Sequence, residues 1–175
     1  IKALGLKGIK LHPDYQGVSI DDIGYKHIID YASELDLIIM VHAGIDIGIP
    51  QPVRCPPEKS LAIIEELQPT KLILAHMGGW KQWDDVERLI AGKNVYMDCA
   101  FCSSYMSPVQ FERIVNKHGA DKILFATDSP WEAPDSTINW IESTSLSGEQ
   151  KQQIYFKNAC EILGLCPEQI GGRES

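Results

Sequence analysis

The chain lacks the features that mark several large classes of protein. It carries 16 basic and 24 acidic side chains, for a net charge of -8, and it has no basic stripe that would bind nucleic acid. No apolar run approaches the roughly 18 residues that span a bilayer, and the first residues do not form a signal peptide. We therefore expect a soluble, cytoplasmic protein with neither nucleic acid nor a membrane as its partner.

Cysteine occurs in an odd number, which argues against a disulfide framework. The chain has five cysteines, and 175 residues are enough to fold around an apolar core without covalent links. Cys99 and Cys102 form a CxxC pair, but the pair follows a strand-like segment rather than opening a helix, where the dipole would lower a thiol pKa. A single pair cannot supply a four-cysteine zinc site. We expect buried or loop cysteines.

Phosphate-binding loops are also absent, since neither GxGxxG nor a Walker motif occurs. The chain contains instead a regular alternation of apolar runs and helix-like segments. The runs are continuous rather than alternately apolar and polar, which is typical of parallel strands covered on both faces. The expected strands are 8–12, 37–41, 71–75, 95–99 and 123–126, and the expected helices are 23–35, 56–67, 83–90, 108–118, a segment around 137–140, and 147–163.

This alternation predicts an α/β fold built from parallel βα repeats. A closed barrel of such repeats needs eight strands and about 250 residues. Residues 1–175 are therefore expected to form a single domain that is a partial (β/α)8 barrel, with about five of the eight strands and without the N-terminal ones. An open, doubly wound sheet is the alternative, and the missing phosphate loop counts against it.

Ionisable side chains follow three of the expected strands. His42 and His76 come directly after the second and third apolar runs, and Asp128 lies just beyond the fifth. The carboxyl ends of parallel strands meet at one edge of a sheet, so these side chains should converge. A single histidine at a strand end can equally satisfy buried backbone groups. Taken together, the three residues predict a metal site at this edge.

Five motifs, each closing an apolar run, occur in a specific order. They are Gly8–Pro13 (GIKLHP), Val41–Gly44 (VHAG), Ala75–Gly79 (AHMGG), Asn94–Asp98 (NVYMD) and Phe125–Trp131 (FATDSPW). In order and spacing the chain resembles the metal-dependent amidohydrolase-2 family, which includes aminocarboxymuconate semialdehyde decarboxylase. The resemblance implies a TIM barrel with a metal at its C-terminal mouth, of which this chain matches the last five strands.

The resemblance also assigns roles to the residues at the strand ends. His42 would ligate a divalent metal, zinc being the expected one, through a ring nitrogen. His76 would be a second ligand or would hydrogen-bond the metal-bound water. Asp128 would ligate the metal weakly and take a proton from that water, which makes Asp128 and His76 the expected catalytic residues. The family's HxH motif is absent from this chain, so its ligand set is incomplete.

The activity implied by the resemblance is metal-dependent hydrolysis of a small carbonyl compound, an amide, ester or lactone, by metal-activated water. The missing HxH motif predicts that this activity is incomplete in the chain alone. A metal-dependent decarboxylase of the same family is the nearest alternative. A non-catalytic half-barrel, acting as a scaffold or assembly module, is another. Unpaired sheet edges would favour a homo-oligomer.

Four further residues are candidates for binding the small-molecule substrate. Lys10 is a solvated strand end, a partner for a substrate carboxylate or, as a third alternative, a carboxylated lysine bridging two metals. His12 either reaches the mouth or makes a structural hydrogen bond. Arg54, in the long loop after the second strand, either binds an anionic substrate or stays exposed. Trp131 forms a wall of the pocket or packs in the core.

Overall fold

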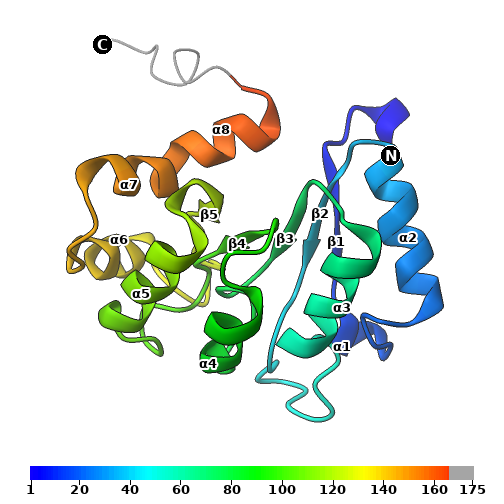
Figure 1. The fold of residues 1–175 in the computed structure, drawn as a ribbon, viewed down its shortest axis with the longest axis horizontal. Helices are drawn as coiled ribbons and strands as arrows, with labels where there is room; N and C mark the ends of the chain where they lie inside the picture. The colour runs from blue at the N-terminus through cyan, green and yellow to red at the C-terminus, as the bar shows by residue number, and fades with distance from the viewer. Residues whose placement is uncertain (166–175) are drawn as a thin grey trace.

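A single sheet of five parallel strands organises the molecule (Figure 1). The computed structural model describes residues 1–165. The sequence predicts fraying after Pro167, and that segment lies outside the described residues. The strands are β1 (Gly8–Leu11), β2 (Ile38–Val41), β3 (Leu72–Leu74), β4 (Tyr96–Asp98) and β5 (Ile123–Leu124). They lie side by side in chain order, whereas a doubly wound sheet reverses its order at one point. This is the order of consecutive barrel strands, as predicted.

Helices connect the strands where the sequence predicts them, and α1 is an additional, unpredicted helix. They are α1 (Pro13–Gln16), α2 (Ile23–Glu34), α3 (Pro57–Leu67), α4 (Trp83–Asp85), α5 (Pro108–His118), α6 (Pro134–Glu142), α7 (Gly148–Gln152) and α8 (Asn158–Leu163). π-Helical turns at Val86–Ile90 and Gln153–Lys157 continue α4 and join α7 to α8, and short 3-10 turns occupy Lys2–Leu4 and Ala120–Lys122. Among residues 1–165, none of these helices has the length and apolarity that crossing a membrane requires.

Polar side chains begin several helices. Asp22 Oδ1 accepts the N–H of Gly24 at 2.8 Å at the start of α2, and Ser107 Oγ accepts the N–H of Gln110 at 3.2 Å at the start of α5. Ser147 heads a reciprocal capping box at α7. These bonds satisfy backbone donors that the first helical turn leaves free, which is why the helices begin at these residues.

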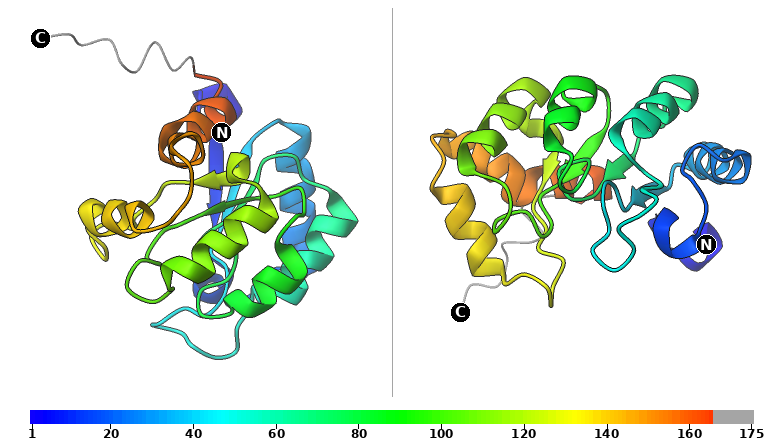
Figure 2. Two further views of the ribbon diagram at one scale, coloured as in Figure 1. Left: turned by 60° about the vertical axis from the view of Figure 1, so that its left-hand side comes forward. Right: turned by 90° about the horizontal axis from the view of Figure 1, so that it is seen from below.

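The two faces of the sheet are covered differently. Successive side chains of a strand point to opposite faces. On one face Ile39, Val41 and Met97 are fully buried in the main core, and α3, α4 and α5 lie along this side (Figure 2). On the other face Ile73 packs in a smaller cluster with Ile162 of α8. All strands run toward the same edge, where α1 and the loop after β2 lie, while α8 lies at the opposite end (Figure 1).

All five strands are shorter than predicted by one or two residues, and for two of them a contact explains the early end. β1 ends at Leu11 because His12 caps the unpredicted helix α1, its Nδ1 accepting the N–H of Tyr15 at 3.4 Å. Pro13 occupies the first position of this helix, where proline is favourable because the N–H that it lacks would have no intrahelical partner. β5 ends early because the N–H of Phe125 donates to the carbonyl of Ile154.

Candidate metal and substrate site

A cavity of about 430 Å³ opens at the carboxyl edge of the sheet. Its walls come from β1 and from the segments that follow all five strands. The lining residues are Lys10, His12, Tyr15, His42, Ile45, Asp46, Ile47, Gly48, His76, Trp80, Phe101, Asp128 and Trp131. The cavity thus brings ionisable side chains together with aromatic walls, a composition typical of small-molecule sites.

Close backbone packing sets the path of the loop that follows β2. Gly44, with φ +87°, forms a parallel bridge with Trp80. A Cβ at Gly44 would lie 2.1 Å from the backbone nitrogen of Trp80, so no other residue fits. The loop leaves this contact through Ile45, whose N–H donates to the Trp80 carbonyl at 3.1 Å. The glycine of the VHAG motif therefore lets the loop approach the cavity.

Three histidines from neighbouring segments lie in contact beside the cavity. His42 Nδ1 is 3.0 Å from His76 Nε2, and both residues are buried. The ring of His12 stacks on the ring of His42, with centroids 4.2 Å apart and planes inclined by 10°. Asp46 Oδ2 is 3.5 Å from His12 Nε2 and 3.8 Å from His42 Nε2. The predicted convergence of His42 and His76 is present, and His12 reaches the mouth.

The electrostatics of this group keep His42 neutral. Burial lowers the pKa of His42 to about 2, and the neighbouring His76 and His12 act in the same direction. Burial also lowers the pKa of His12, although Asp46 opposes this shift. His42 Nε2 is buried and has no hydrogen-bond partner among the described residues. A buried nitrogen with a free lone pair beside a carboxylate is a donor set that a divalent cation would satisfy.

The residues present fit a metal through more than one donor. Single ligand atoms of His12, His42 and Asp46 all lie within 4.8 Å of one another. Asp128 lines the same cavity in an exposed position, in a left-handed backbone conformation with φ +59°. Both ring nitrogens of His76 are engaged, one by His42 and the other by the carbonyl of Ala100 at 2.9 Å. In this arrangement neither nitrogen of His76 is free for a metal.

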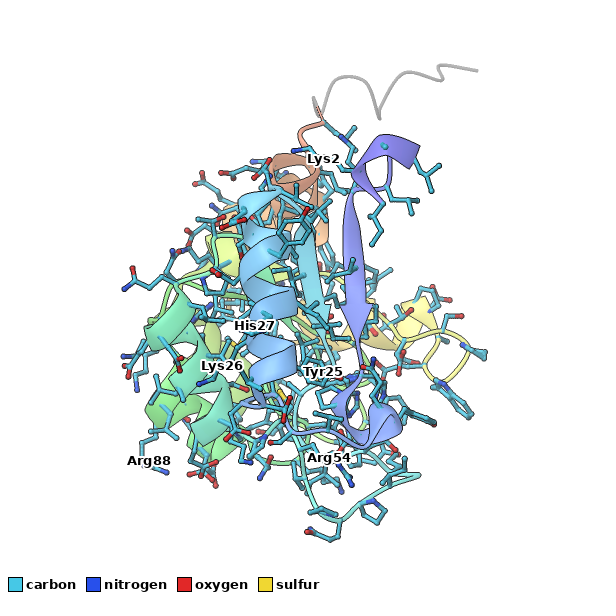
Figure 3. The ribbon with its side chains drawn as sticks, turned by 90° about the vertical axis from the view of Figure 1, so that its right-hand side faces the viewer. Lys2, Tyr25, Lys26, His27, Arg54 and Arg88 are labelled. Atoms are coloured by element: carbon cyan, nitrogen blue, oxygen red, sulfur yellow. The ribbon has the colours of Figure 1, made fainter. Side chains whose placement is uncertain are left out.

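Of the residues predicted to bind substrate, some line the cavity and one does not. Lys10 and Trp131 both line the cavity, and Trp131 is 74% exposed rather than packed in the core. Arg54 is not among the lining residues, and its Nη1 donates to the carbonyl of Pro52 at 3.3 Å. Figure 3 shows Arg54 close to α1. The role of Arg54 in binding an anion remains a prediction that this position does not favour.

Sequence reasoning missed several residues of the site. Asp46, Tyr15 and Phe101 all line the cavity, and the ring of Phe101 stacks on that of Trp80, which the sequence left open as a pocket wall or a core residue. Asp46 lies four residues after His42, a spacing that would have drawn attention to it if the loop path had been known. The path of this loop depends on its contacts with the segment that follows β3. The sequence does not reveal these contacts.

The CxxC pair lies outside this site. Cys99 and Cys102 are fully buried, and both are free thiols. Burial raises the pKa of Cys99 to about 12 and raises that of Cys102 well above its usual range. Burial therefore keeps both side chains in the unreactive thiol form.

Comparison with known proteins identifies relatives. The chain is 43% identical over 47 residues to the gamma-resorcylate decarboxylase of Polaromonas sp. (strain JS666), a match that covers 27% of this chain and 14% of the relative. It superposes on the crystal structure of a dihydroxybenzoic acid decarboxylase from Polaromonas sp. JS666, with bound manganese and the inhibitor 2-nitroresorcinol, with a TM-score of 0.65 and 18% identity. That superposition covers 93% of this chain and 62% of the other.

An uncharacterised TIM-barrel protein from Bordetella bronchiseptica superposes with a TM-score of 0.76 and 17% identity, covering 94% of this chain and 59% of the other. The chain thus spans about three fifths of each of these two solved structures. The likeness confirms the predicted partial barrel. The sequence model of the amidohydrolase family matches residues 1–165, and the chain belongs to this family.

Proposed function

We propose that the protein carrying this chain is a divalent-metal-dependent decarboxylase of hydroxylated aromatic carboxylic acids. The observation that carries the proposal is the unpartnered, buried Nε2 of His42 in a cavity with aromatic walls. The two relatives above with a named activity are decarboxylases. This favours the decarboxylase alternative over the hydrolysis of an amide, ester or lactone that the sequence led us to expect first.

The metal would be held by His42 Nε2 and the carboxylates of Asp46 and Asp128. When bound, a divalent cation withdraws electron density from the oxygen atoms of the substrate that it contacts. One imidazole with two carboxylates suits manganese, the metal in the Polaromonas structure, as well as the predicted zinc. His76 would join this set only if its bond to His42 broke.

Lys10 is the residue suited to bind the substrate carboxylate. It lines the cavity from β1, where it is an exposed residue of the strand. Although its side chain keeps solvent-accessible surface, desolvation of the ammonium lowers its pKa, and Asp98 and Asp128 oppose this shift. An ammonium that remains charged binds a carboxylate through a charge-assisted hydrogen bond. The walls of Trp80, Phe101 and Trp131 would contact the flat faces of an aromatic ring.

The reaction requires one bond to break and one proton to move. The bond between the ring carbon and the carboxylate carbon breaks, carbon dioxide leaves, and the electron pair remains on the ring carbon. That carbon then takes a proton that comes from solvent, and we assign Asp128 to relay it. The exposed position of Asp128 at the cavity lets it recover a proton from solvent after each turnover. The aromatic walls exclude water from the ring.

An assay with 2,6-dihydroxybenzoate and Mn²⁺ tests the proposal. We expect resorcinol and carbon dioxide in equal amounts, loss of activity on chelation, and a fall of about 10²- to 10⁴-fold in the Asp128→Asn variant. Asp135→Asn, an exposed change on α6, is the matched control and should retain full activity.

Other outcomes overturn the proposal. Hydrolysis of a test ester or lactone, with 2,6-dihydroxybenzoate left intact, would restore the hydrolase interpretation. Absence of both activities in the metal-loaded protein, with the same result for 2,4- and 2,3-dihydroxybenzoate, would favour the non-catalytic half-barrel.

A further inference from the structure

The site described so far gives no role to Asp98, at the end of β4. This residue is 2% exposed, and its Oδ1 accepts the N–H groups of His76 at 2.9 Å and of Ala100 at 3.1 Å. Its carbonyl oxygen accepts the N–H of Met77 at 2.6 Å. His76 and Met77 have φ values of +58° and +52°, a left-handed conformation that is unfavourable for residues other than glycine. Asp98 therefore holds both the strained turn after β3 and the backbone N–H of Ala100.

The hydrogen-bond partners of the His76 ring determine which of its nitrogens carries a proton. Its Nδ1 is 2.9 Å from the carbonyl oxygen of Ala100. A carbonyl oxygen can only accept, so Nδ1 of His76 carries a proton. The main chain of His76 is held in turn by the indole N–H of Trp83, which donates to its carbonyl at 3.0 Å. A neutral imidazole that is protonated at Nδ1 presents a lone pair at Nε2, so His76 offers an acceptor to His42.

His42 must supply the matching donor. Its Nδ1 lies 3.0 Å from His76 Nε2, so Nδ1 of His42 carries the proton in this pair. The Nε2 of a neutral His42 then has no proton. This is the nitrogen that is buried, that lacks a partner among residues 1–165 and that lies 3.8 Å from Asp46 Oδ2. A histidine must be deprotonated at the nitrogen that binds a metal, and His42 already is.

We propose that His76 and Asp98 are positioning residues that fix His42 in its Nδ1–H tautomer and so keep its Nε2 available to a divalent metal. Histidine ligands in metal sites generally donate their other ring N–H to an acceptor, which orients the ring. Here the acceptor is a second histidine, and its tautomer is fixed by the backbone carbonyl of Ala100, a residue whose N–H is bound by Asp98. The inference rests on the proposed metal site and does not depend on decarboxylation.

The same hydrogen-bond argument gives His12 the opposite tautomer from His42. Nδ1 of His12 accepts the N–H of Tyr15 at the start of α1, so a neutral His12 carries its proton on Nε2. That nitrogen lies 3.5 Å from Asp46 Oδ2, so His12 turns its protonated nitrogen toward the carboxylate. His12 in this form offers no lone pair at Nε2, although its ring lies within 4.8 Å of the ligand atoms of His42 and Asp46.

A second arrangement of protons in this pair would place the proton of His42 on its other ring nitrogen. If His76 carried two protons, it would donate to both Ala100 and His42. His42 would then accept at Nδ1 and hold its proton on Nε2, directed at Asp46. The two arrangements differ in which nitrogen of His42 bears the hydrogen, and that difference is measurable.

Long-range ¹H–¹⁵N spectra of the metal-free, ¹⁵N-histidine-labelled protein distinguish protonated from bare ring nitrogens. His118 serves as an internal reference, because Nδ1 accepts the N–H of Gly92 at 3.1 Å and Nε2 donates to the carbonyl of Val95 at 2.9 Å. We expect His42 and His76 in the Nδ1–H form and His118 in the Nε2–H form. A proton on Nε2 of His42, or a doubly protonated His76, would overturn the inference.

Variants test whether His76 causes the tautomer of His42. His76→Leu removes the acceptor, so His42 should move its proton to Nε2, where Asp46 can accept it. His76→Gln keeps an acceptor oxygen and should keep the Nδ1–H form. Asp98→Asn keeps Oδ1 and should resemble the wild type, whereas Asp98→Ala should broaden or shift the His42 signals. An unchanged His42 tautomer in His76→Leu would contradict the proposal.

Mn²⁺ affinity of the same proteins provides a second readout. We expect a loss of about 10- to 100-fold in His76→Leu and a loss of less than about 10-fold in His76→Gln. Equal losses in both variants would identify His76 as a direct ligand and overturn its positioning role. Because neither readout uses the aromatic acid, a failed decarboxylation assay beside a confirmed tautomer would overturn the proposed function alone.

Discussion

Two buried histidines of this protein are alike in their burial and in the direction of their pKa shift. They differ in the hydrogen-bond partners of their ring nitrogens. His42 is 7% exposed and His118 is 8% exposed, and burial lowers the pKa of both. Both ring nitrogens of His118 are satisfied, by the N–H of Gly92 and the carbonyl of Val95. His42 has a partner only at Nδ1, and its buried Nε2 has none among the described residues.

The difference separates properties that follow from packing from one that points to a candidate site. Burial and a lowered pKa are shared, so they follow from packing and do not identify a site. A buried polar atom without a partner is uncommon in folded proteins and calls for a ligand that is not part of the chain. His118 joins α5 to the segments around β4, whereas the unpartnered nitrogen of His42 supports the metal site that we propose.

Replacement of these two histidines should give the largest and most clearly separated effects. In the decarboxylation assay with Mn²⁺, His42→Ala should lower kcat/KM by more than about 100-fold, above the effect expected for residues that only support a ligand. His118→Ala should leave kcat/KM within about threefold of the wild type under conditions where it is folded. Equal losses in the two variants would remove the distinction.

The stability of the same variants should rank in the opposite order. His118→Ala leaves the N–H of Gly92 and the carbonyl of Val95 without partners, which should lower the free energy of unfolding by about 2–4 kcal/mol. His42→Ala should cost less, because it removes one hydrogen bond and an unsatisfied atom. Urea denaturation of the metal-free proteins measures both. His27→Ala, an exposed change on α2 (Figure 3), is the control and should stay within about 0.5 kcal/mol.

Lys10 separates substrate binding from metal binding. Lys10→Met removes the proposed partner of the substrate carboxylate, and the loss of one charge-assisted hydrogen bond should lower kcat/KM by about 10- to 100-fold, mainly through KM. Mn²⁺ affinity should not fall. Lys26→Met, which breaks a surface pair with Glu66, is the matched control. An unchanged KM in Lys10→Met would contradict the assignment.

The pH dependence of stability should be the smallest effect and the one that the two histidines share. The folded state keeps His42 neutral down to about pH 2, whereas the unfolded chain takes up a proton below its ordinary pKa near 6.5. Stability should therefore be complete above pH 6.5 and fall below it, by about 1.4 kcal/mol at pH 5.5 for one such histidine. His118 adds to this fall, and the raised pKa of buried Asp14 opposes it.

Urea midpoints of the metal-free protein at about pH 7.5 and about pH 5.5 measure this effect. His42→Gln should lose about 1 kcal/mol less than the wild type between the two values. The same pH dependence in both proteins would show that the pKa of His42 is not lowered.

The sequence predicted the parts of this molecule that depend on strand order. Apolar runs that end in His42 and His76 were enough to place both rings at one edge of a parallel sheet, and they lie 3.0 Å apart. The motif after β5 likewise brought Asp128 and Trp131 to the cavity. Parallel strands impose this convergence whatever the loops between them do.

The sequence could not predict the paths of the loops or the hydrogen-bond partners of the histidine rings. Asp46 reaches the cavity because Gly44 packs against Trp80 and its N–H donates to the Cys55 carbonyl at 2.9 Å, contacts made across distant segments. Arg54, in the same loop, looked equally suited and lies elsewhere. The difference between His118 and His42 also needed the structure, because it lies in what each ring nitrogen touches.

Titration of the metal-free protein with Mn²⁺, followed by the electron paramagnetic resonance signal of the free ion, tests most directly whether the free nitrogen of His42 is a metal ligand. We predict about one site per chain in the wild type and in His118→Gln, and loss of that site in His42→Ala. Retention of the site in His42→Ala, with wild-type affinity, would contradict the account.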